Sequence, residues 1–189
     1  VSRRSILSEV SSVFDPLGLI SPFLLKGKLL LRELCRGGFD WDEPVPSDVT
    51  EAWKEWKTSM LALRDIRVPR CYVDGGLRDD LTVELHHFSD ASSVAYGQCS
   101  YLRTVDNEGV VTCSLVISKA RVAPSKPMTV PRLELTAAVL STRISRFLQD
   151  ELKVVNMKEF FWTDSAVVLG YISNEARRFH VFVANRVQV

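Results

Sequence analysis

The chain has 189 residues, 46% of them hydrophobic, which is enough for one well-packed core with a smaller unit attached. Its 24 basic and 23 acidic residues nearly cancel, so the overall charge gives no sign of nucleic-acid binding and any basic surface must be local. No apolar run is long enough to span a membrane, the N-terminus has no signal-peptide pattern and the cysteines have no metal-ligand spacing, so we expect an intracellular protein with reduced thiols.

The first residues of the chain are predicted to form two helices. A short helix over residues 5–14 ends at Asp15-Pro16-Leu17-Gly18, because proline restricts the residue before it and glycine frees the backbone. An amphipathic helix over residues 22–35 follows, and Gly37 with Gly38 ends it.

A third helix is predicted over residues 47–63. Ser47 or Asp48 can cap its first turn, and Trp53 and Trp56 lie on one stripe at a spacing typical of core residues. The N-terminal region is therefore expected to be a small helical unit.

The stretch over residues 73–80 is polar, acidic and glycine-bearing, which suits a linker. We place a domain boundary there, with a helical domain over residues 1–73 and a second domain over residues 81–189. The second domain begins with strands over residues 81–89, 94–103 and 110–118. Since these strands follow one another and a turn joins the last two, they predict an antiparallel meander.

The rest of the second domain alternates helix and strand. A long amphipathic helix over residues 132–152 precedes a buried strand over 159–163, a short helix over 165–172 and a helix-like piece over 178–189. One face of the long helix is expected to be buried, and its members are Leu133, Ala137, Leu140, Ile144, Phe147 and Leu148. This order of elements predicts an α/β domain.

Three carboxylates stand on these elements at positions where they can meet. Asp90 follows the first strand, Asp164 follows the later strand, and Glu134 lies in the first turn of the long helix beside its apolar stripe. Three acids on rigid elements can bind a pair of Mg²⁺ ions for phosphodiester hydrolysis, one ion activating water and the other stabilising the leaving oxygen. Taken singly, each acid also has a plainer explanation as a turn or helix-terminus residue.

The chain resembles the ribonuclease H domain of reverse-transcriptase polyproteins, most closely that of BEL/Pao-type retrotransposons. Upstream, Phe14-Asp15-Pro16-Leu17-Gly18 with the leucine-rich helix after it is similar to the thumb or connection segment that follows the polymerase palm. The resemblance in the second domain is carried by Phe88-Ser89-Asp90-Ala91-Ser92, Lys119-Ala120-Arg121-Val122-Ala123-Pro124, Pro131-Arg132-Leu133-Glu134-Leu135, Trp162-Thr163-Asp164-Ser165 and Phe182-Val183-Ala184-Asn185-Arg186.

The resemblance implies a ribonuclease H-like fold, with a mixed five-stranded sheet flanked by helices, and cleavage of the RNA in RNA–DNA hybrids. Asp90, Glu134 and Asp164 would be the catalytic residues and would bind Mg²⁺, with Mn²⁺ as the alternative ion. The family uses a further carboxylate on a helix after a fifth strand, and the chain reaches Val189 before either. We therefore expect a C-terminally truncated domain that is weakly active or inactive as this fragment.

The expected partners are an RNA–DNA hybrid and the remainder of the polyprotein, with no membrane contact, in cytoplasmic element particles and the nucleus. A local excess of basic residues surrounds Glu134, so phosphate contacts compete with a merely solvated surface as its explanation. The candidate nucleic-acid-binding residues are Lys119, Arg121, Lys126, Arg132, Asn185 and Arg186.

Two alternatives stay open at the level of sequence. The chain could be a non-catalytic nucleic-acid-binding or structural module of the polyprotein. It could also carry the aspartic-peptidase label given to this region of Pao-type elements. Peptidases of that class need an Asp-Thr-Gly or Asp-Ser-Gly turn, and the nearest approach is Asp164-Ser165-Ala166. Proteolysis therefore ranks low on mechanism.

Overall fold

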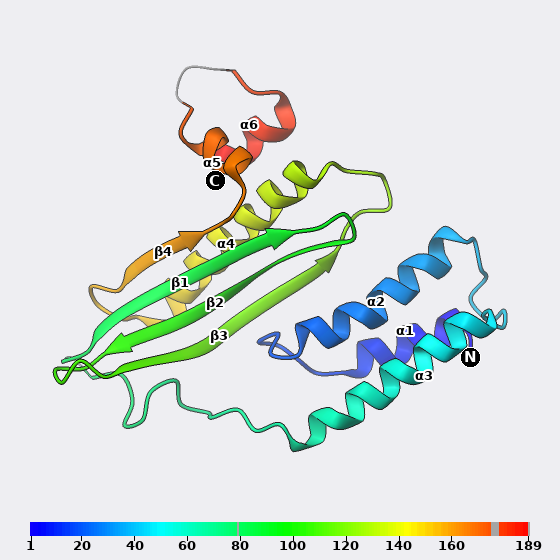
Figure 1. The fold of residues 1–189 in the computed structure, drawn as a ribbon, viewed down its shortest axis with the longest axis horizontal. Helices are drawn as coiled ribbons and strands as arrows, with labels where there is room; N and C mark the ends of the chain where they lie inside the picture. Colours follow the sequence, from blue (N-terminus) through cyan, green and yellow to red (C-terminus); the bar gives the residue numbers. More distant parts are fainter. Residues whose placement is uncertain (79, 175–177, 189) are drawn as a thin grey trace.

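A computed structural model describes residues 1–78, 80–174 and 178–188 of the chain (Figure 1). Its N-terminal part is a helical unit, as predicted, and each helix begins within two residues of the predicted start. The helices are α1 (Arg3–Ser12), α2 (Ser21–Arg36) and α3 (Ser47–Ala62), with a short 3₁₀ helix, η1 (Leu63–Asp65), at the end of α3.

Aromatic packing holds the three N-terminal helices together. Trp53 and Trp56 on α3 stack with ring centroids 4.5 Å apart, and both are buried as predicted. Gly27 lets α2 pack closely against α1 and α3, because an added Cβ there would lie 2.8 Å from Val10 on α1 and 3.0 Å from Trp56 on α3. The indole of Trp56 also donates a hydrogen bond of 2.8 Å to the carbonyl of Phe23, so the buried N–H group is satisfied.

The predicted cap of α3 is wrong. Pro46 occupies the N-cap position, and no side chain among the described residues caps the helix there, whereas Ser47 and Asp48 lie inside its first turn. Proline has no N–H to satisfy and its fixed φ suits the entry to a helix. Asp48 still favours the helix, because a negative charge in the first turn complements the helix dipole.

The second part of the chain is built on a four-stranded mixed sheet. Its strands are β1 (Thr82–Ala91), β2 (Ala95–Val105), β3 (Val111–Val122) and β4 (Lys158–Trp162), in the spatial order β3-β2-β1-β4. The first three form the predicted antiparallel meander, and β4 pairs with β1 in parallel. A parallel pair needs a long crossover, which the helix between β3 and β4 supplies.

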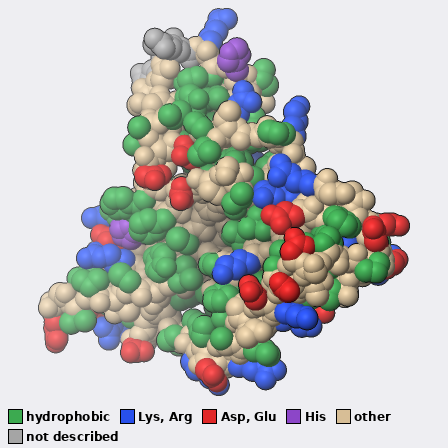
Figure 2. Space-filling model, turned by 45° about the vertical axis from the view of Figure 1, so that its right-hand side comes forward, with side chains coloured by type: hydrophobic (Ala, Val, Ile, Leu, Met, Phe, Trp, Pro, Cys, Tyr) green, Lys and Arg blue, Asp and Glu red, His purple; other side chains and the backbone are tan. Residues whose placement is uncertain are grey.

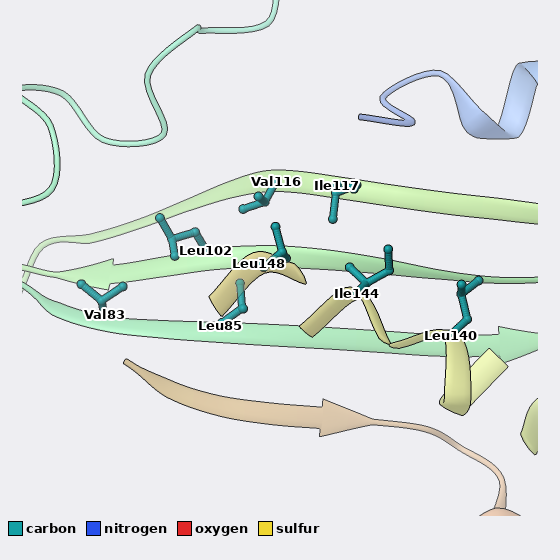
Figure 3. Close-up of a cluster of buried hydrophobic side chains, with 8 residues drawn as sticks. All are labelled: Val83, Leu85, Leu102, Val116, Ile117, Leu140, Ile144 and Leu148. Carbon is teal, nitrogen blue, oxygen red and sulfur yellow. The ribbon is translucent and has the colours of Figure 1, made fainter. Parts of the chain in front are cut away.

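The helix α4 (Val130–Leu152) covers one face of the sheet (Figure 1). Leucine, isoleucine and valine side chains from α4 and the three antiparallel strands meet between the two layers (Figure 3), and the members of this core are Val83, Leu85, Leu102, Val116, Ile117, Leu140, Ile144 and Leu148. Phe147, which was predicted to share the buried face, is 48% exposed. It lies beside the stripe that repeats at Leu140, Ile144 and Leu148, so the rotation of the helix turns it outward.

Two short helices pack against the N-terminal part of α4. These helices, α5 (Ala166–Ile172) and α6 (Val181–Val187), pack with α4 around the buried side chains of Leu135, Val168 and Val183. The predicted last element over residues 178–189 is thus a helix of seven residues, and Val189 lies outside the described residues. No helix in the described ranges is long and apolar enough to cross a membrane.

The strand β4 was predicted to be buried, and this prediction is wrong. Phe160, Phe161 and Trp162 are 37%, 51% and 50% exposed. The reason is the position of β4 at the edge of the sheet, where it has a neighbouring strand on one side only. Aromatic residues are frequent in strands whether or not both faces are covered, so the composition could not reveal the exposure.

The helical unit docks onto β3 through the loop between α1 and α2. The carbonyl of Leu17 accepts a 2.8 Å hydrogen bond from the backbone N–H of Ser118, and the carbonyl of Gly18 accepts one of 2.5 Å from its hydroxyl. Arg32 of α2 adds a hydrogen bond of 2.9 Å to the carbonyl of Val94. The linker predicted over residues 73–80 contains turns, and Asp79 in it lies outside the described residues.

Candidate functional site

The parallel pairing of β1 and β4 places Asp90 and Asp164 at the same edge of the sheet. Phe88 is registered with Trp162, and each aspartate lies two residues further along its chain. Both aspartates are exposed and line the same cavity of about 690 Å³. Because adjacent parallel strands have their C-terminal ends side by side, two acids distant in sequence line one cavity.

The opposite wall of this cavity comes from the helical unit. Ser21, Pro22 and Leu25 of α2 face the strand ends across it, so the cavity, which we call the acidic cavity, lies where the two parts of the chain meet. Figure 2 shows hydrophobic side chains gathered in the middle of one face of the molecule, with acidic side chains above them. Sequence reasoning missed this contribution of α2, since nothing in its pattern distinguishes these residues from other residues of an amphipathic helix.

Glu134 on α4 does not line the acidic cavity and instead contacts Ser165, the residue after Asp164. Glu134 is half-buried in the second turn of the helix, not the first as predicted, because α4 begins two residues earlier than expected, and its Oε2 accepts a 2.5 Å hydrogen bond from the hydroxyl of Ser165. The same hydroxyl accepts a hydrogen bond of 3.2 Å from the N–H of Val168 and thereby caps α5. Because Ser165 directly follows Asp164, this hydrogen bond ties Glu134 to the segment after β4.

The structure brings Asp90 and Asp164 to one cavity and Glu134 to the neighbour of Asp164. It does not close the three acids into an ion-binding cluster: within the described ranges, no group of three His, Cys, Asp or Glu side chains lies close enough to hold a metal ion. Asp90 instead accepts a 2.6 Å hydrogen bond from the backbone N–H of Ala91. The metal site thus stays a prediction.

A polar network centred on His87 and Glu159 connects the sheet to α4. His87, fully buried, contacts the hydroxyl of Ser100 through Nδ1 at 2.8 Å and a carboxylate oxygen of Glu159 through Nε2 at 3.4 Å. Ser145 and Gln149 of α4 donate hydrogen bonds to the same carboxylate. Burial lowers the pKa of the His87 imidazole, against the raising effect of Glu159. The network connects β1, β2, β4 and α4 through side-chain contacts.

The adjacent His86 and His87 point to opposite faces of the sheet, because successive side chains of a strand alternate. His86 lies on the face away from α4, where it stacks on Phe160 at 4.9 Å and accepts a 3.1 Å hydrogen bond from the indole of Trp162. Phe88 and Trp162 stack on the same face with ring centroids 6.1 Å apart, and each stands two residues before one of the aspartates. The acids therefore stand at the end of a row of stacked aromatic rings.

The candidate nucleic-acid-binding residues divide between two hollows and a loop. Lys119 on β3 lines the acidic cavity. Arg121, Asn185 and Arg186 line a second cavity, and Lys126 lies exposed in the loop after β3. Arg132 lies over the ring of Phe182, 5.2 Å from its centroid.

Sequence reasoning missed two further residues of the second cavity, Arg143 and Thr136, both on α4. They share one helix face at a separation of seven residues, a periodicity that was available in the sequence. This periodicity alone does not indicate a site, because the cavity forms only where α6 packs against this part of α4.

Comparison with known proteins identifies the family. The family model described as Pao retrotransposon-like RNaseH-like domain matches residues 2–165. No curated protein matches the chain. Among solved structures, the foamy viral protease-reverse transcriptase dRH in complex with ds DNA is similar, with 12% identity and a TM-score of 0.41, and the match covers 97% of this chain and 32% of that one. The family description together with the mixed sheet and its flanking helices confirms the ribonuclease H-like fold class.

Proposed function

The chain belongs to the family of Pao retrotransposon-like RNase H-like domains, and on this basis we propose that it is the nuclease part of a retrotransposon reverse transcriptase. Its reaction would be metal-dependent hydrolysis of the RNA strand in RNA–DNA hybrids. The observation that carries the proposal is the meeting of Asp90 and Asp164 in one cavity, with Glu134 tied to Ser165 beside them.

The chemistry of these side chains fits a hard divalent cation. All three are carboxylates, and oxygen ligands of this kind are what Mg²⁺ and Mn²⁺ prefer. Asp90 and Asp164 are exposed to solvent in the acidic cavity, so an ion can reach them without unfolding. Asp90, Glu134 and Asp164 would hold the ion or ion pair, which when bound would supply activation of water and stabilisation of the leaving oxygen.

The side chains around the acids would position them. The hydroxyl of Ser165 fixes the carboxylate of Glu134 by its hydrogen bond, and the N–H of Ala91 orients Asp90. The stacked rings of Phe88 and Trp162 stiffen the ends of the strands that carry the two aspartates. Such preorganisation matters because small displacements of reacting groups reduce a reaction rate strongly.

The substrate proposed is a duplex with an RNA strand, bound through its phosphates and 2′-hydroxyls. Lys119 in the acidic cavity supplies a positive charge beside the acids, and Arg121 follows it on β3 after one residue. Two positive charges at this edge of the sheet would draw the phosphate backbone toward the carboxylates.

The test is cleavage of a labelled RNA–DNA hybrid with and without Mg²⁺. We expect Mg²⁺-dependent cleavage that Asp90→Asn removes and that Asp150→Asn, an exposed aspartate on the far half of α4, leaves unchanged. Binding of Mg²⁺ or Mn²⁺ to the chain, followed by calorimetry, should weaken in Asp90→Asn without loss of the fold.

Two results would separate this proposal from a non-catalytic module. Binding of the hybrid without cleavage, together with unchanged ion binding in Asp90→Asn, would leave the chain a nucleic-acid-binding part of the polyprotein. Unfolding of Asp90→Asn, Glu134→Gln and Asp164→Asn alike would assign the three acids structural roles.

A further inference from the structure

The part of the sheet beside Asp90 is hollow. Asp90 on β1 stands opposite Gly97 on β2, and Gly97 stands opposite Ala120 on β3. All three residues line the acidic cavity. A Cβ added at Gly97 would lie 2.8 Å from the carbonyl oxygen of Lys119, so a side chain does not fit there. With a hydrogen atom and a methyl group as their side chains, Gly97 and Ala120 leave room next to the carboxylate.

Apolar and aromatic side chains stand on two sides of this space. Phe88 and Trp162 line it from the strand ends, and their rings are nearly parallel, at an interplanar angle of 11°. Pro22 and Leu25 line it from α2. The cavity has a volume of about 690 Å³, and cavities of about 300–1,000 Å³ with mostly apolar walls and a few polar groups bind small organic ligands. These walls suit a flat aromatic ring such as a nucleobase.

The indole of Trp162 is held in a fixed orientation. Its N–H group donates a 3.1 Å hydrogen bond to Nδ1 of His86, so the neutral imidazole carries its proton on Nε2, which lies 3.3 Å from a carboxylate oxygen of Glu84. Arg103 donates a hydrogen bond of 2.6 Å to the same oxygen and lowers the pKa of Glu84, and His86 adds to this effect. The indole ring is still 50% exposed, so its surface is open to a ligand. A ring that is fixed in advance loses little freedom when a ligand stacks on it.

The aromatic rings stand close to the acids. On β1, Phe88 and Asp90 lie on the same face of the sheet, and residues two apart in a strand are separated by about 6–7 Å, or roughly two nucleotide steps of a stacked strand. Trp162 likewise stands two residues before Asp164. A base that stacks on Trp162 therefore belongs to a strand whose neighbouring phosphates reach the carboxylates.

We infer that the acidic cavity binds an unpaired nucleobase, which stacks on Trp162 and has Pro22 and Leu25 on its other side. The inference rests on the proposed function for the strand that carries the base, and it adds a requirement on the substrate, namely an unpaired nucleotide beside the cleaved bond. Extruding a base from a duplex costs unstacking and unpairing energy, which an already unpaired nucleotide does not require. Because every base has a flat aromatic face, stacking gives little sequence preference.

The test uses a short RNA–DNA hybrid in which one RNA nucleotide, a fluorescent purine analogue, has no partner base. Its binding to the chain in EDTA is measured by anisotropy and by quenching of the analogue. We expect Trp162→Ala to weaken binding about 5- to 100-fold and to remove the quenching, while Trp162→Phe keeps most of both. The fully paired hybrid should bind more weakly and be indifferent to Trp162→Ala. Phe161→Ala is the matched control and should bind like the unaltered chain, because this ring is equally exposed on the same strand but stacks on His87 at the opposite face.

Leu25→Ala on the opposite wall is a second probe should Trp162→Ala unfold in a melting curve, and it should also weaken binding. Unaltered affinity and quenching in Trp162→Ala and Leu25→Ala would overturn the inference, as would equal losses in Trp162→Ala and Phe161→Ala. Displacement of the hybrid by an equal concentration of a nucleoside monophosphate would overturn it too, because the ligand would then be a free nucleotide. Quenching that depends on Trp162 in a chain that cleaves nothing would refute the nuclease and keep the base site. Cleavage with binding and quenching indifferent to Trp162 would do the reverse.

Discussion

Gly18 holds the helical unit against the sheet, and its replacement by alanine should break that contact. Its φ is +72°, in the left-handed region, and a Cβ added there would lie 1.9 Å from the carbonyl oxygen of Ser118. The left-handed backbone costs about 1–2 kcal/mol for a residue other than glycine. Separating the loop from β3 also removes the two hydrogen bonds to Ser118, each contributing about 0.5–1.5 kcal/mol. The total loss expected is about 2–5 kcal/mol.

Gly38 provides a matched control for this substitution. Its φ is +73°, and an added Cβ would meet nothing within 4 Å. Gly38→Ala should therefore carry only the backbone cost, and the difference between the two variants isolates the contact with Ser118. This difference should be about 1–3 kcal/mol, which in a chain of this size corresponds to about 2–4 °C of melting temperature for each kcal/mol.

Urea unfolding of both variants measures the two free energies, and hydrogen exchange at the amide of Ser118 gives a local readout. We expect Gly18→Ala to lose protection at this amide, because its acceptor is the carbonyl of Leu17. Equal destabilisation by Gly18→Ala and Gly38→Ala, with Ser118 still protected, would refute the docking of the loop on β3.

Three further predictions concern the sheet and the site. Because burial lowers the pKa of His87 in the folded chain, the unfolded chain binds a proton at this imidazole at a higher pH, and the free energy of unfolding should fall as pH drops below about 6.5, by up to about 1.4 kcal/mol per pH unit. Urea unfolding from pH 8 to 5 should show a shallower fall in His87→Phe. An identical pH dependence in the variant and the unaltered chain would contradict the assignment to His87. Ser165→Ala should cost about 1–2 kcal/mol, measured by urea unfolding, because α5 loses its cap and the carboxylate of Glu134 loses its hydroxyl donor. Leu85→Ala should cost about 2–5 kcal/mol in calorimetry, because Leu85 is fully buried in the core, and a loss below 1 kcal/mol would place it elsewhere.

The local elements could be predicted because their signals are local. The 3.6-residue repeat of Leu140, Ile144 and Leu148 marks both the helix α4 and its buried face. The turn before β3 is marked by Asp106, whose carboxylate accepts hydrogen bonds from the N–H groups of Glu108 and Val110. Nothing beyond a few neighbouring residues is needed for either conclusion.

The errors fall where a neighbour distant in sequence decides the outcome. The exposure of Trp162 follows from the edge position of β4, and the exposure of Phe147 follows from the rotation of α4 on the sheet. The second cavity is another example, since Arg143 and Arg186 line it together only because α6 packs on α4. Sequence periodicity shows which face of a single helix or strand is apolar. It does not show which other helix or strand packs against that face.

The meeting of Asp90 and Asp164 depends on which edge of the sheet β4 joins. After the crossover through α4, β4 had two edges available, that of β1 and that of β3. Beside β3, two strands would have separated Asp164 from Asp90. Beside β1, both acids line one cavity. The β3 edge is already engaged, because its Ser118 N–H donates to the carbonyl of Leu17. The helical unit thus contributes twice to the candidate site, through the wall formed by α2 and by occupying part of the edge that β4 does not use.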